Sequence, residues 1–307
     1  MRVLITGGSG MVGRNLLEHT ASNRFSIIAP SSQELNLYDF DATKKFLLKC
    51  SPDILIHSAG IVGGIQANIR EPFKFLVGNL DIGRNLICAA RDVGIKRLIN
   101  LGSSCMYPRN CSDPLSEEMV LKGELEPTNE GYALAKIVSA RLCDYISREN
   151  SEYQYKTLIP CNIYGRHDKF DPSQSHLIPA IIHKIQVAIS NKKDSVDVWG
   201  DGLARREFMY SEDLADAIYS AIDRFETLPS IMNVGLGYDH TINEYYKEVA
   251  AIVGFEGQFV NDLSKPVGMA RKLVCVKRLN KWGWEAKHSL SEGIEKTYKF
   301  YLEKHNK

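Results

Sequence analysis

The sequence predicts an α/β fold, in which a Rossmann-type, doubly wound parallel sheet is joined to a smaller C-terminal α/β substrate domain. In the first 165 residues, short apolar runs rich in β-branched residues alternate with longer amphipathic patterns. This alternation is typical of a parallel sheet with helices on both faces. A glycine-rich turn separates the first apolar run from the first amphipathic pattern. After residue 165 the alternation weakens into segments with His, Asp and Pro, so a domain change is expected there.

Each strand is expected where a short apolar run is bounded by turn residues. In the first domain these runs occupy residues 3–6, 26–29, 54–58, 97–102 and 157–160. Helical periodicity lies between them, at residues 13–21, 41–49, 72–93 and 131–148. The second half is expected to hold helices at 179–190, 211–224, 241–253 and 289–303, and strands at 195–199 and 231–234.

The second region is expected to be woven into the first, because a strand at 231–234 would return to the first sheet. The prediction is therefore a first domain over residues 1–165, completed by segments near 207–235. Residues 166–307 would mainly bind the substrate. The sequence shows no internal repeat, low-complexity stretch or linker between the two parts.

The composition indicates a cytoplasmic globular protein. Lys plus Arg number 38 and Asp plus Glu number 37, a net charge of +1, so neither nucleic acid nor an anionic membrane is expected as a partner. The seven cysteines are scattered and form no CxxC pair, which predicts reduced thiols with no disulfide framework and no metal site. No apolar run approaches the roughly 20 residues of a membrane span. The sequence opens on a core-like strand, so no signal peptide is expected.

Glycines at positions 7, 10 and 13 follow the first strand and open the first helix. Glycine permits a tight turn and lets the backbone approach a ligand closely. The free N–H groups and the dipole at the start of a helix favour a pyrophosphate there. This position predicts dinucleotide binding, and a glycine-rich turn without a ligand is the alternative. The residues expected to contact the dinucleotide here are Gly7, Gly10, Met11 and Val12.

The end of the second strand indicates which coenzyme is used. An acidic residue there would accept the ribose 2′-hydroxyl of NAD, and a basic one would bind the 2′-phosphate of NADP. Ser31 and Ser32 occupy this place, with no acidic residue at the expected position and no arginine. Because hydroxyl groups can donate to a phosphate, NADPH is the expected coenzyme, with NADH also accepted. Asn36, Leu37 and Ala59 are expected to lie along the same coenzyme.

Tyr132 and Lys136 are four residues apart on one face of a predicted helix. A tyrosine has a free pKa of about 10, and a nearby ammonium is expected to lower it, so that Tyr132 can transfer a proton to or from a carbonyl oxygen. Ser103 stands at the end of an upstream strand, where ligands of such sheets bind. An ordinary amphipathic helix and a turn cap are the alternatives. In this order, the glycine turn, the serine and the Tyr–Lys pair match extended short-chain dehydrogenases/reductases.

The chain also carries longer strings that are more specific than a Tyr–Lys pair. They occupy residues 62–65, 101–108, 125–130, 162–165, 167–168, 172–179, 199–202, 206–208, 265–266 and 271–273. In this order, over almost the whole chain, they resemble GDP-L-fucose synthases, the family of GDP-4-keto-6-deoxy-mannose 3,5-epimerase/4-reductases. The resemblance implies an NADP(H)-dependent homodimeric enzyme of nucleotide-sugar biosynthesis, whose substrate is a GDP-linked 4-keto-6-deoxy sugar.

The resemblance also assigns roles to further residues. Cys105 and His176 match the family's residues that move protons at carbons 3 and 5, and His176 also contacts the coenzyme. The 4-keto group acidifies both carbons, and inversion needs a base on one face and an acid on the other. A core cysteine and a loop histidine are the alternatives. The residues matching the sugar-nucleotide site are Asn162, Lys184, Trp199, Arg206 and Arg271. Of these, Lys184 and Arg271 could instead be surface charges, and Trp199 could belong to the core.

The chain departs from the family where arginines would bind a 2′-phosphate. Gly8 and Ser9 replace His-Arg, Pro30 and Ser31 replace an arginine-containing stretch, and Gly131 replaces a proline. The preference for NADPH is therefore expected to be incomplete. Three alternatives remain for the activity: a GDP-L-colitose synthase acting on a 3,6-dideoxy ketone, a reductase of a GDP-linked heptose, and a non-catalytic dinucleotide-binding regulator.

Overall fold

The computed structural model describes residues 1–111, 113–171, 175–265 and 268–305. Its centre is a six-stranded sheet in the order β10-β5-β4-β3-β1-β2, and all neighbouring strands are parallel. The strands are β1 (Arg2–Thr6), β2 (Ser26–Ile28), β3 (Ile54–His57), β4 (Arg97–Leu101), β5 (Gln154–Pro160) and β10 (Ile231–Val234). The predicted Rossmann-type sheet is confirmed.

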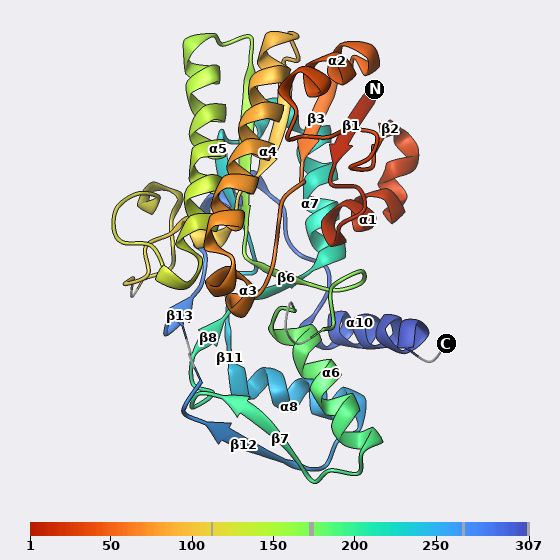
Figure 1. Cartoon of the computed structure of the whole chain (residues 1–307), viewed down its shortest axis with the longest axis vertical. Helices are drawn as coiled ribbons and strands as arrows, with labels where there is room; N and C mark the ends of the chain where they lie inside the picture. The colour runs from red at the N-terminus through yellow and green to blue at the C-terminus, as the bar shows by residue number, and fades with distance from the viewer. Residues whose placement is uncertain (112, 172–174, 266–267, 306–307) are drawn as a thin grey trace.

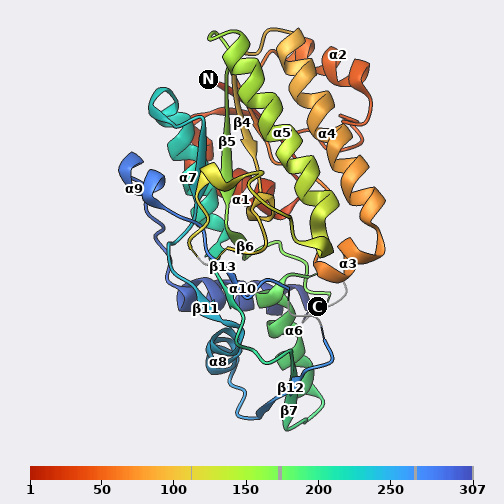
Figure 2. The ribbon, with the colours of Figure 1, turned by 90° about the vertical axis from the view of Figure 1, so that its left-hand side faces the viewer.

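Helices cover both faces of this sheet (Figure 2). On one side lie α2 (Phe40–Cys50), α4 (Pro72–Asp92) and α5 (Glu130–Glu149), and on the other lie α1 (Met11–Glu18) and α7 (Ser211–Asp223). Alternate residues of one strand enter different cores, since Leu4 packs with α2 and α4 while Ile5 packs with α7. A sheet buried on both faces explains why its strands read as nearly continuous apolar runs.

The lower part of the molecule in Figure 1 has a core of its own, formed by three helices and several short strands. The helices are α6 (Leu177–Ser190), α8 (Ile242–Val253) and α10 (Leu290–His305). Two parallel pairs are present, β7 (Ser195–Trp199) with β12 (Gln258–Asp262), and β6 (Asn162–Tyr164) with β9 (Phe208–Tyr210). A three-stranded sheet has the order β11 (His240–Thr241), β8 (Arg205–Arg206) and β13 (Arg271–Lys272).

Several elements differ from those expected. The first helix starts at Met11, two residues early, and a 3₁₀ turn at Thr20–Arg24 follows it. The sixth helix begins at Leu177 rather than at residue 179. Two short helices, α3 (Ile65–Arg70) and α9 (Lys277–Trp282), were not expected, because six residues do not show a helical period.

Two properties of the described residues bear on function. Within the ranges given above, no helix has the length and apolar character needed to cross a membrane. In the same ranges, no three His, Cys, Asp or Glu side chains come together in a way that could hold a metal ion. Residues 172–174 and 266, which belong to two of the resembling strings, lie outside the described residues.

Candidate active site

The glycine-rich turn lies at the carboxyl end of β1, against the carboxyl end of β3. Gly7 has a left-handed backbone (φ +75°), and a Cβ there would stand 2.7 Å from the backbone nitrogen of Ala59. A Cβ on Gly13 would overlap the Gly7 carbonyl. Gly10 begins α1 without a side-chain cap, so the first N–H groups of the helix suit an anion. The turn brings together the predicted contacts Gly7, Gly10, Met11, Val12 and Ala59.

The turn after β2 contains an acidic group that the sequence did not lead us to expect there. The Ser31 N–H donates to Glu34 Oε2 at 2.8 Å, and the Glu34 N–H donates to Ser31 Oγ at 3.3 Å. The expectation that no acidic side chain stands at the place of Ser31 and Ser32 is therefore wrong, because Glu34 folds back onto the turn. The hydrogen bonds from Ser31 lower the pKa of Glu34. Downstream, Leu37 is buried and Asn36 is exposed.

Ser103, Tyr132 and Lys136 meet at the carboxyl edge of the sheet. Ser103 follows the end of β4, and the other two residues lie in the first half of α5. Lys136 Nζ donates to the Leu101 carbonyl oxygen at 2.9 Å and lies 5.9 Å from the centroid of the Tyr132 ring. The hydroxyl of Ser103 hydrogen-bonds with that of Tyr132. The structure thus brings the three residues predicted for carbonyl reduction into one group.

Burial determines the protonation of this group. It raises the pKa of Tyr132, and the neighbouring Cys105 raises it further, whereas the hydrogen bond with Ser103 lowers it. Burial also lowers the pKa of Lys136 to about 8. The expectation that Lys136 lowers the pKa of Tyr132 is therefore wrong for this structure, because the ammonium is directed at the Leu101 carbonyl. At neutral pH Tyr132 is a phenol, which is the form that donates a proton.

Cys105 has polar neighbours on its sulfur. It lies in a short 3₁₀ turn after β4, where its N–H donates to Ser103 Oγ at 3.3 Å. Asn129 Nδ2 lies 3.2 Å from Cys105 Sγ, and Lys272 Nζ lies 3.4 Å from it. Both groups are hydrogen-bond donors, so these surroundings suit a sulfur with negative charge. Cys143, by contrast, is fully buried in the apolar core.

His176 immediately precedes α6. Burial lowers its pKa to about 4, and the ammonium groups of Lys272 and Lys169 act in the same direction. His176 is therefore neutral at pH 7. Because Lys272 acts on His176 and also contacts Cys105, the structure brings the two residues predicted for epimerisation to the same cation.

Arg271 shares a carboxylate with a second arginine. Arg205 Nε donates to Asp239 Oδ1 at 2.6 Å, and Arg271 Nε donates to Asp239 Oδ2 at 2.5 Å. The two arginines are partners in the register of β8 and β13. The Asp239 side chain is only 3% exposed, whereas those of the arginines are 40% and 43% exposed. One buried acid therefore orients two half-exposed guanidinium groups.

Arg206 and Asn162 lie close to the same small sheet. Arg206 Nη1 donates to the Arg205 carbonyl oxygen at 2.8 Å, and burial lowers the pKa of Arg206. Asn162 Nδ2 donates to the Glu207 carbonyl oxygen at 2.8 Å. The buried Glu207 carboxylate accepts three backbone N–H groups, and burial raises its pKa to about 7. These bonds tie β6, which carries Asn162, to the segment that carries Arg206.

Lys184 and Trp199 form a separate pair around Asp197. Lys184 Nζ donates to Asp197 Oδ2 at 2.7 Å, and Trp199 Nε1 donates to the same oxygen at 3.0 Å. Lys184 Nζ also lies 5.2 Å from the centroid of a Trp199 ring. Trp199 is 37% exposed, so it does not belong to the core. A role for this pair in substrate binding stays a prediction.

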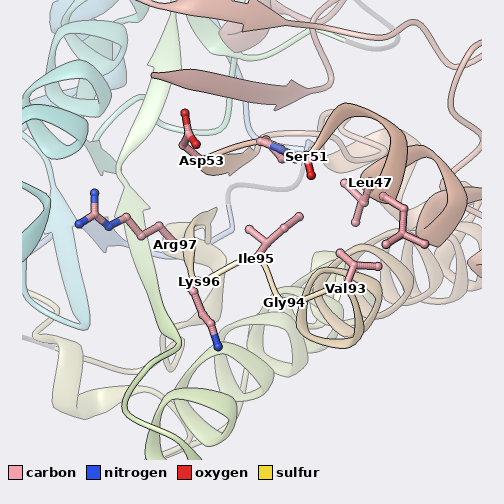
Figure 3. A pocket seen from close by; sticks show the side chains of 10 residues that line it. Leu47, Ser51, Asp53, Val93, Gly94, Ile95, Lys96 and Arg97 are labelled. Atoms are coloured by element: carbon pink, nitrogen blue, oxygen red, sulfur yellow. The ribbon is translucent and has the colours of Figure 1, made fainter.

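A pocket at the opposite edge of the sheet contains none of these residues. Its lining comes from segments that precede β3 and β4, including Ser51, Asp53, Ile95 and Lys96 (Figure 3). The pocket has a volume of about 310 Å³. Ligands of doubly wound sheets bind outside the carboxyl ends of the strands. The candidate active site is therefore the carboxyl edge, where Ser103, the glycine turn and Cys105 converge.

Comparison with known proteins identifies the family of this chain. Residues 3–235 match the NAD dependent epimerase/dehydratase family. The chain belongs to this family. The match begins in β1 and ends just after β10, so it includes every strand of the parallel sheet.

The similarity of this chain to individual proteins covers nearly its whole length. It is 56% identical over 306 residues to the GDP-L-colitose synthase of Yersinia pseudotuberculosis, covering 100% of this chain and 99% of that protein. It is 47% identical over 301 residues to the GDP-L-fucose synthase of Azorhizobium caulinodans, covering 98% and 96%. A solved GDP-mannoheptose C4 reductase from Campylobacter jejuni with NADP bound is 30% identical, with a TM-score of 0.87 over 98% of each chain. The resemblance to GDP-L-fucose synthases is confirmed.

Five residues of the candidate active site were not identified from the sequence. Arg205 directly precedes one resembling string and Lys272 lies within another, but the resemblance assigned neither of them a role. Asp197 and Asp239 had no such signal, because each acts through ion pairs with cations that are distant in the sequence. Glu34 does not stand at the position where an acid would be expected, and only the structure shows its carboxylate at the Ser31 amide.

Proposed function

We propose that this family member is a bifunctional 3,5-epimerase and 4-reductase that acts on a GDP-linked 4-keto-6-deoxy sugar with NADPH. One observation carries the proposal: Ser103, Tyr132 and Lys136 meet the donor-flanked thiol of Cys105 at one edge of the sheet. Carbonyl reduction needs the first three residues, and epimerisation needs a base beside the same carbonyl. The similarity to GDP-L-fucose and GDP-L-colitose synthases supports both steps.

The glycine turn has room for a dinucleotide. A Cβ on Gly10 would meet only the Gly7 carbonyl oxygen, at 3.4 Å, so this side of the turn faces space at the start of α1. Gly7, Gly10, Met11, Val12 and Ala59 would hold the pyrophosphate region, and Ser31 and Ser32 the ribose. The chemistry that bound NADPH supplies is a hydride for carbon 4. We expect NADPH to be preferred over NADH by about ten- to thirtyfold in kcat/KM, about 1–2 kcal/mol, because the serines lack charge.

Reduction depends on the protonated form of Tyr132. The raised pKa of Tyr132 keeps the phenol protonated at neutral pH, so it can give its proton to the oxygen on carbon 4. Ser103 hydrogen-bonds with Tyr132 and would hold that oxygen in place. Lys136 is charged below a pH of about 8 and would bond the nicotinamide ribose while keeping its contact with Leu101.

Epimerisation precedes reduction, because the ketone at carbon 4 is what acidifies carbons 3 and 5. Cys105 would remove a proton from each carbon, and His176 would return one to the opposite face. In the ligand-free protein the pKa of His176 is about 4, so the residue must gain a proton before it can donate one. The negative charge of a bound diphosphate favours that gain.

The sugar nucleotide would be held by charges of the C-terminal region. Arg271 and Arg206 supply the planar donor groups that suit a diphosphate. Asn162 follows the carboxyl end of β5 by two residues, and Lys184 with Trp199 offers a cation and an aromatic surface. We assign residues 166–307 mainly to this task, and residues 1–165, completed by segments near 207–235, to the coenzyme.

The structure of the substrate at carbon 3 is the open choice within this proposal. A 3-hydroxyl group would give a GDP-L-fucose type of product, and a 3-deoxy carbon would give GDP-L-colitose. The identity of 56% to a GDP-L-colitose synthase, against 47% to a GDP-L-fucose synthase, favours the 3-deoxy ketone, in which carbon 5 alone would be inverted because carbon 3 is not a stereocentre. A regulator without activity is disfavoured, because Ser103, Tyr132 and Lys136 are all present and in contact.

The decisive experiment offers both ketones to the purified protein. We expect NADPH absorbance to fall with each GDP-4-keto-6-deoxy sugar, faster with the 3-deoxy form, and NMR of the product to show inversion at carbon 5. Unchanged absorbance with both ketones would favour the regulator. Reduction without inversion would favour a reductase of the heptose type.

We also propose a cytoplasmic homodimer. α4 and α5 lie side by side (Figure 2) and expose several apolar side chains, including Phe73 at 76% and Tyr145 at 51% exposure, together with Leu134 and Val138. An apolar surface on two helices is suited to self-association. Val138→Asp should shift the sedimentation coefficient to that of a monomer. The seven free cysteines support a reducing compartment.

A further inference from the structure

Lys272 contacts the sulfur on which the proposed epimerisation depends. Its Nζ lies 3.4 Å from Cys105 Sγ, although the two residues are 167 positions apart in the sequence. Asn129 Nδ2 reaches the same sulfur at 3.2 Å. The sulfur therefore faces one charged donor and one neutral donor, an arrangement that stabilises a thiolate more than a thiol.

The small sheet fixes the direction of Lys272. Arg271 and Lys272 are consecutive residues of β13, so their side chains leave the strand on opposite sides. Arg271 is held by Asp239 on one side, which leaves Lys272 directed at Cys105 on the other. The strand itself pairs with β8, where Lys272 is the partner of Arg206.

The chain after β13 is bonded to the loop that follows Cys105. The Leu115 N–H donates to the Leu273 carbonyl oxygen at 2.8 Å, and the Cys275 N–H donates to the Leu115 carbonyl oxygen at 2.9 Å. Lys272 therefore approaches the sulfur on a strand that is attached to the loop. This attachment distinguishes it from a surface lysine that samples many positions.

Two further titratable groups that interact with Cys105 come from α5. They are Tyr132 and Lys136, and each is electrostatically coupled to the sulfur. Lys136 is already committed to the Leu101 carbonyl, and Tyr132 is a phenol at neutral pH. Within the described part of the chain, Lys272 is thus the ammonium that bonds directly to Cys105 Sγ.

We propose that Lys272 is a positioning residue for epimerisation, whose ammonium bonds to Cys105 Sγ, favours the thiolate over the thiol and aims the sulfur at the substrate; this rests on the proposed function. In the step it serves, the C–H bond beside the ketone breaks and its proton forms an S–H bond with Cys105. The electron pair of that bond moves into the enolate that includes the carbon 4 oxygen. A proton from His176 then forms the new C–H bond on the opposite face.

The first test needs no substrate. Cys105 is alkylated with iodoacetamide at pH 7 in the full-length protein, and the peptide that carries it is followed by mass spectrometry. Loss of an ammonium next to sulfur lowers the thiolate population, so Lys272→Met should slow alkylation of Cys105 by about tenfold or more. Lys272→Arg should retain most of the rate. Lys277→Met removes an exposed ammonium from the nearby α9 and should change nothing.

The second test measures epimerisation alone. Without NADPH, deuterium from solvent enters carbons 3 and 5 of a GDP-4-keto-6-deoxy sugar, and Lys272→Met should slow this exchange about as much as the alkylation. Lys272→Met should bind NADPH with the wild-type Kd, whereas a general disturbance of the fold would weaken this binding. Unchanged alkylation in Lys272→Met would overturn the proposal, and so would slower alkylation with unchanged exchange. An absence of exchange in the wild-type protein would instead contradict the proposed function, and the alkylation result would still decide the role of Lys272.

Discussion

The carboxyl edge of the parallel sheet and the small sheet of β8, β11 and β13 hold their polar side chains in different ways. At the sheet edge, Lys136 is buried and bonded to a backbone carbonyl, and Tyr132 packs against it in the same helix. In the small sheet, Arg205 and Arg271 are about 40% exposed and are held by the buried carboxylate of Asp239. Packing positions the first group, and ion pairing positions the second.

The two arrangements suit different tasks. Burial changes the pKa of a group, as it does for Tyr132 and Lys136, and a changed pKa controls proton transfer. Half-exposed arginines keep their charge and reach a ligand, but salt in solution screens them. Substitutions at the sheet edge should therefore act mainly on kcat, and substitutions in the small sheet mainly on KM for the sugar nucleotide.

The largest effect is expected for Tyr132→Phe. This change keeps the ring that packs against Phe75 and removes the proton donor, so reduction should fall by on the order of 10² or more. NADPH binding, measured by fluorescence titration, should be retained. Reduction at nearly the wild-type rate would show that the sheet edge does not carry the chemistry.

The second-largest effect is expected for Asp239→Asn, which tests the small sheet. An amide cannot pair with both guanidinium groups, so Arg205 and Arg271 should lose their fixed directions. We expect KM for the sugar nucleotide to rise by about ten- to thirtyfold with little change in kcat, since a charge-assisted bond is worth about 1.5–3 kcal/mol.

Two controls separate this effect from a loss of folding. Asp239→Glu should recover part of the affinity, and Glu285→Gln removes an exposed carboxylate outside the small sheet and should leave KM unchanged. A wild-type KM that does not rise with ionic strength would argue against ion pairing with the diphosphate. A fall in kcat alone would mean that Asp239 serves the reaction itself.

The same contrast explains what the sequence could predict. β1, the glycine turn and α5 were predicted because their signals are local, in the form of apolar periodicity and residues at fixed spacing. β8 and β13 have two residues each, too few to show a period, and they form only because distant segments meet. The pairing of Asp239 with two arginines, and of Lys272 with Cys105, depends on that meeting.

Sequence spacing also predicted the wrong direction for the pKa of Tyr132. A Tyr and a Lys four residues apart in a helix do share a face, as predicted. The spacing does not reveal that Lys136 is buried, or that its ammonium bonds to the end of β4. Burial and the neighbouring Cys105 raise the pKa of Tyr132, so the direction of its shift depends on the tertiary structure.

A third prediction concerns the stability effect of burying Lys136. Its pKa of about 8 in the folded protein lies below the ordinary value of 10.5, so the folded protein loses this proton first as pH rises. Below pH 8 the buried ammonium destabilises the fold fully, and the penalty shrinks as pH approaches 10.5. Lys136→Met should therefore raise the free energy of unfolding at pH 7. The net gain should be about 1 kcal/mol, because the lost hydrogen bond to Leu101 offsets part of it. Activity is lost in this variant. Urea denaturation across this pH range should show the gain disappearing.

The smallest effect is expected at Glu34, an exposed acid in the turn after β2, where the coenzyme is proposed to bind. Its lowered pKa keeps the carboxylate ionised at neutral pH, and its bond to the Ser31 amide holds the charge beside the place proposed for a 2′-phosphate. Glu34→Gln should raise kcat/KM for NADPH by about two- to fivefold, since an exposed charge pair is weak, and leave the value for NADH nearly unchanged. The gain should shrink at high salt, because screening already weakens the repulsion in the wild-type protein. A loss of NADH activity in Glu34→Gln would mean that the carboxylate binds the ribose hydroxyl. The carboxyl edge of the parallel sheet would then bind a ligand with an exposed charged side chain, as is proposed for the arginines of the small sheet.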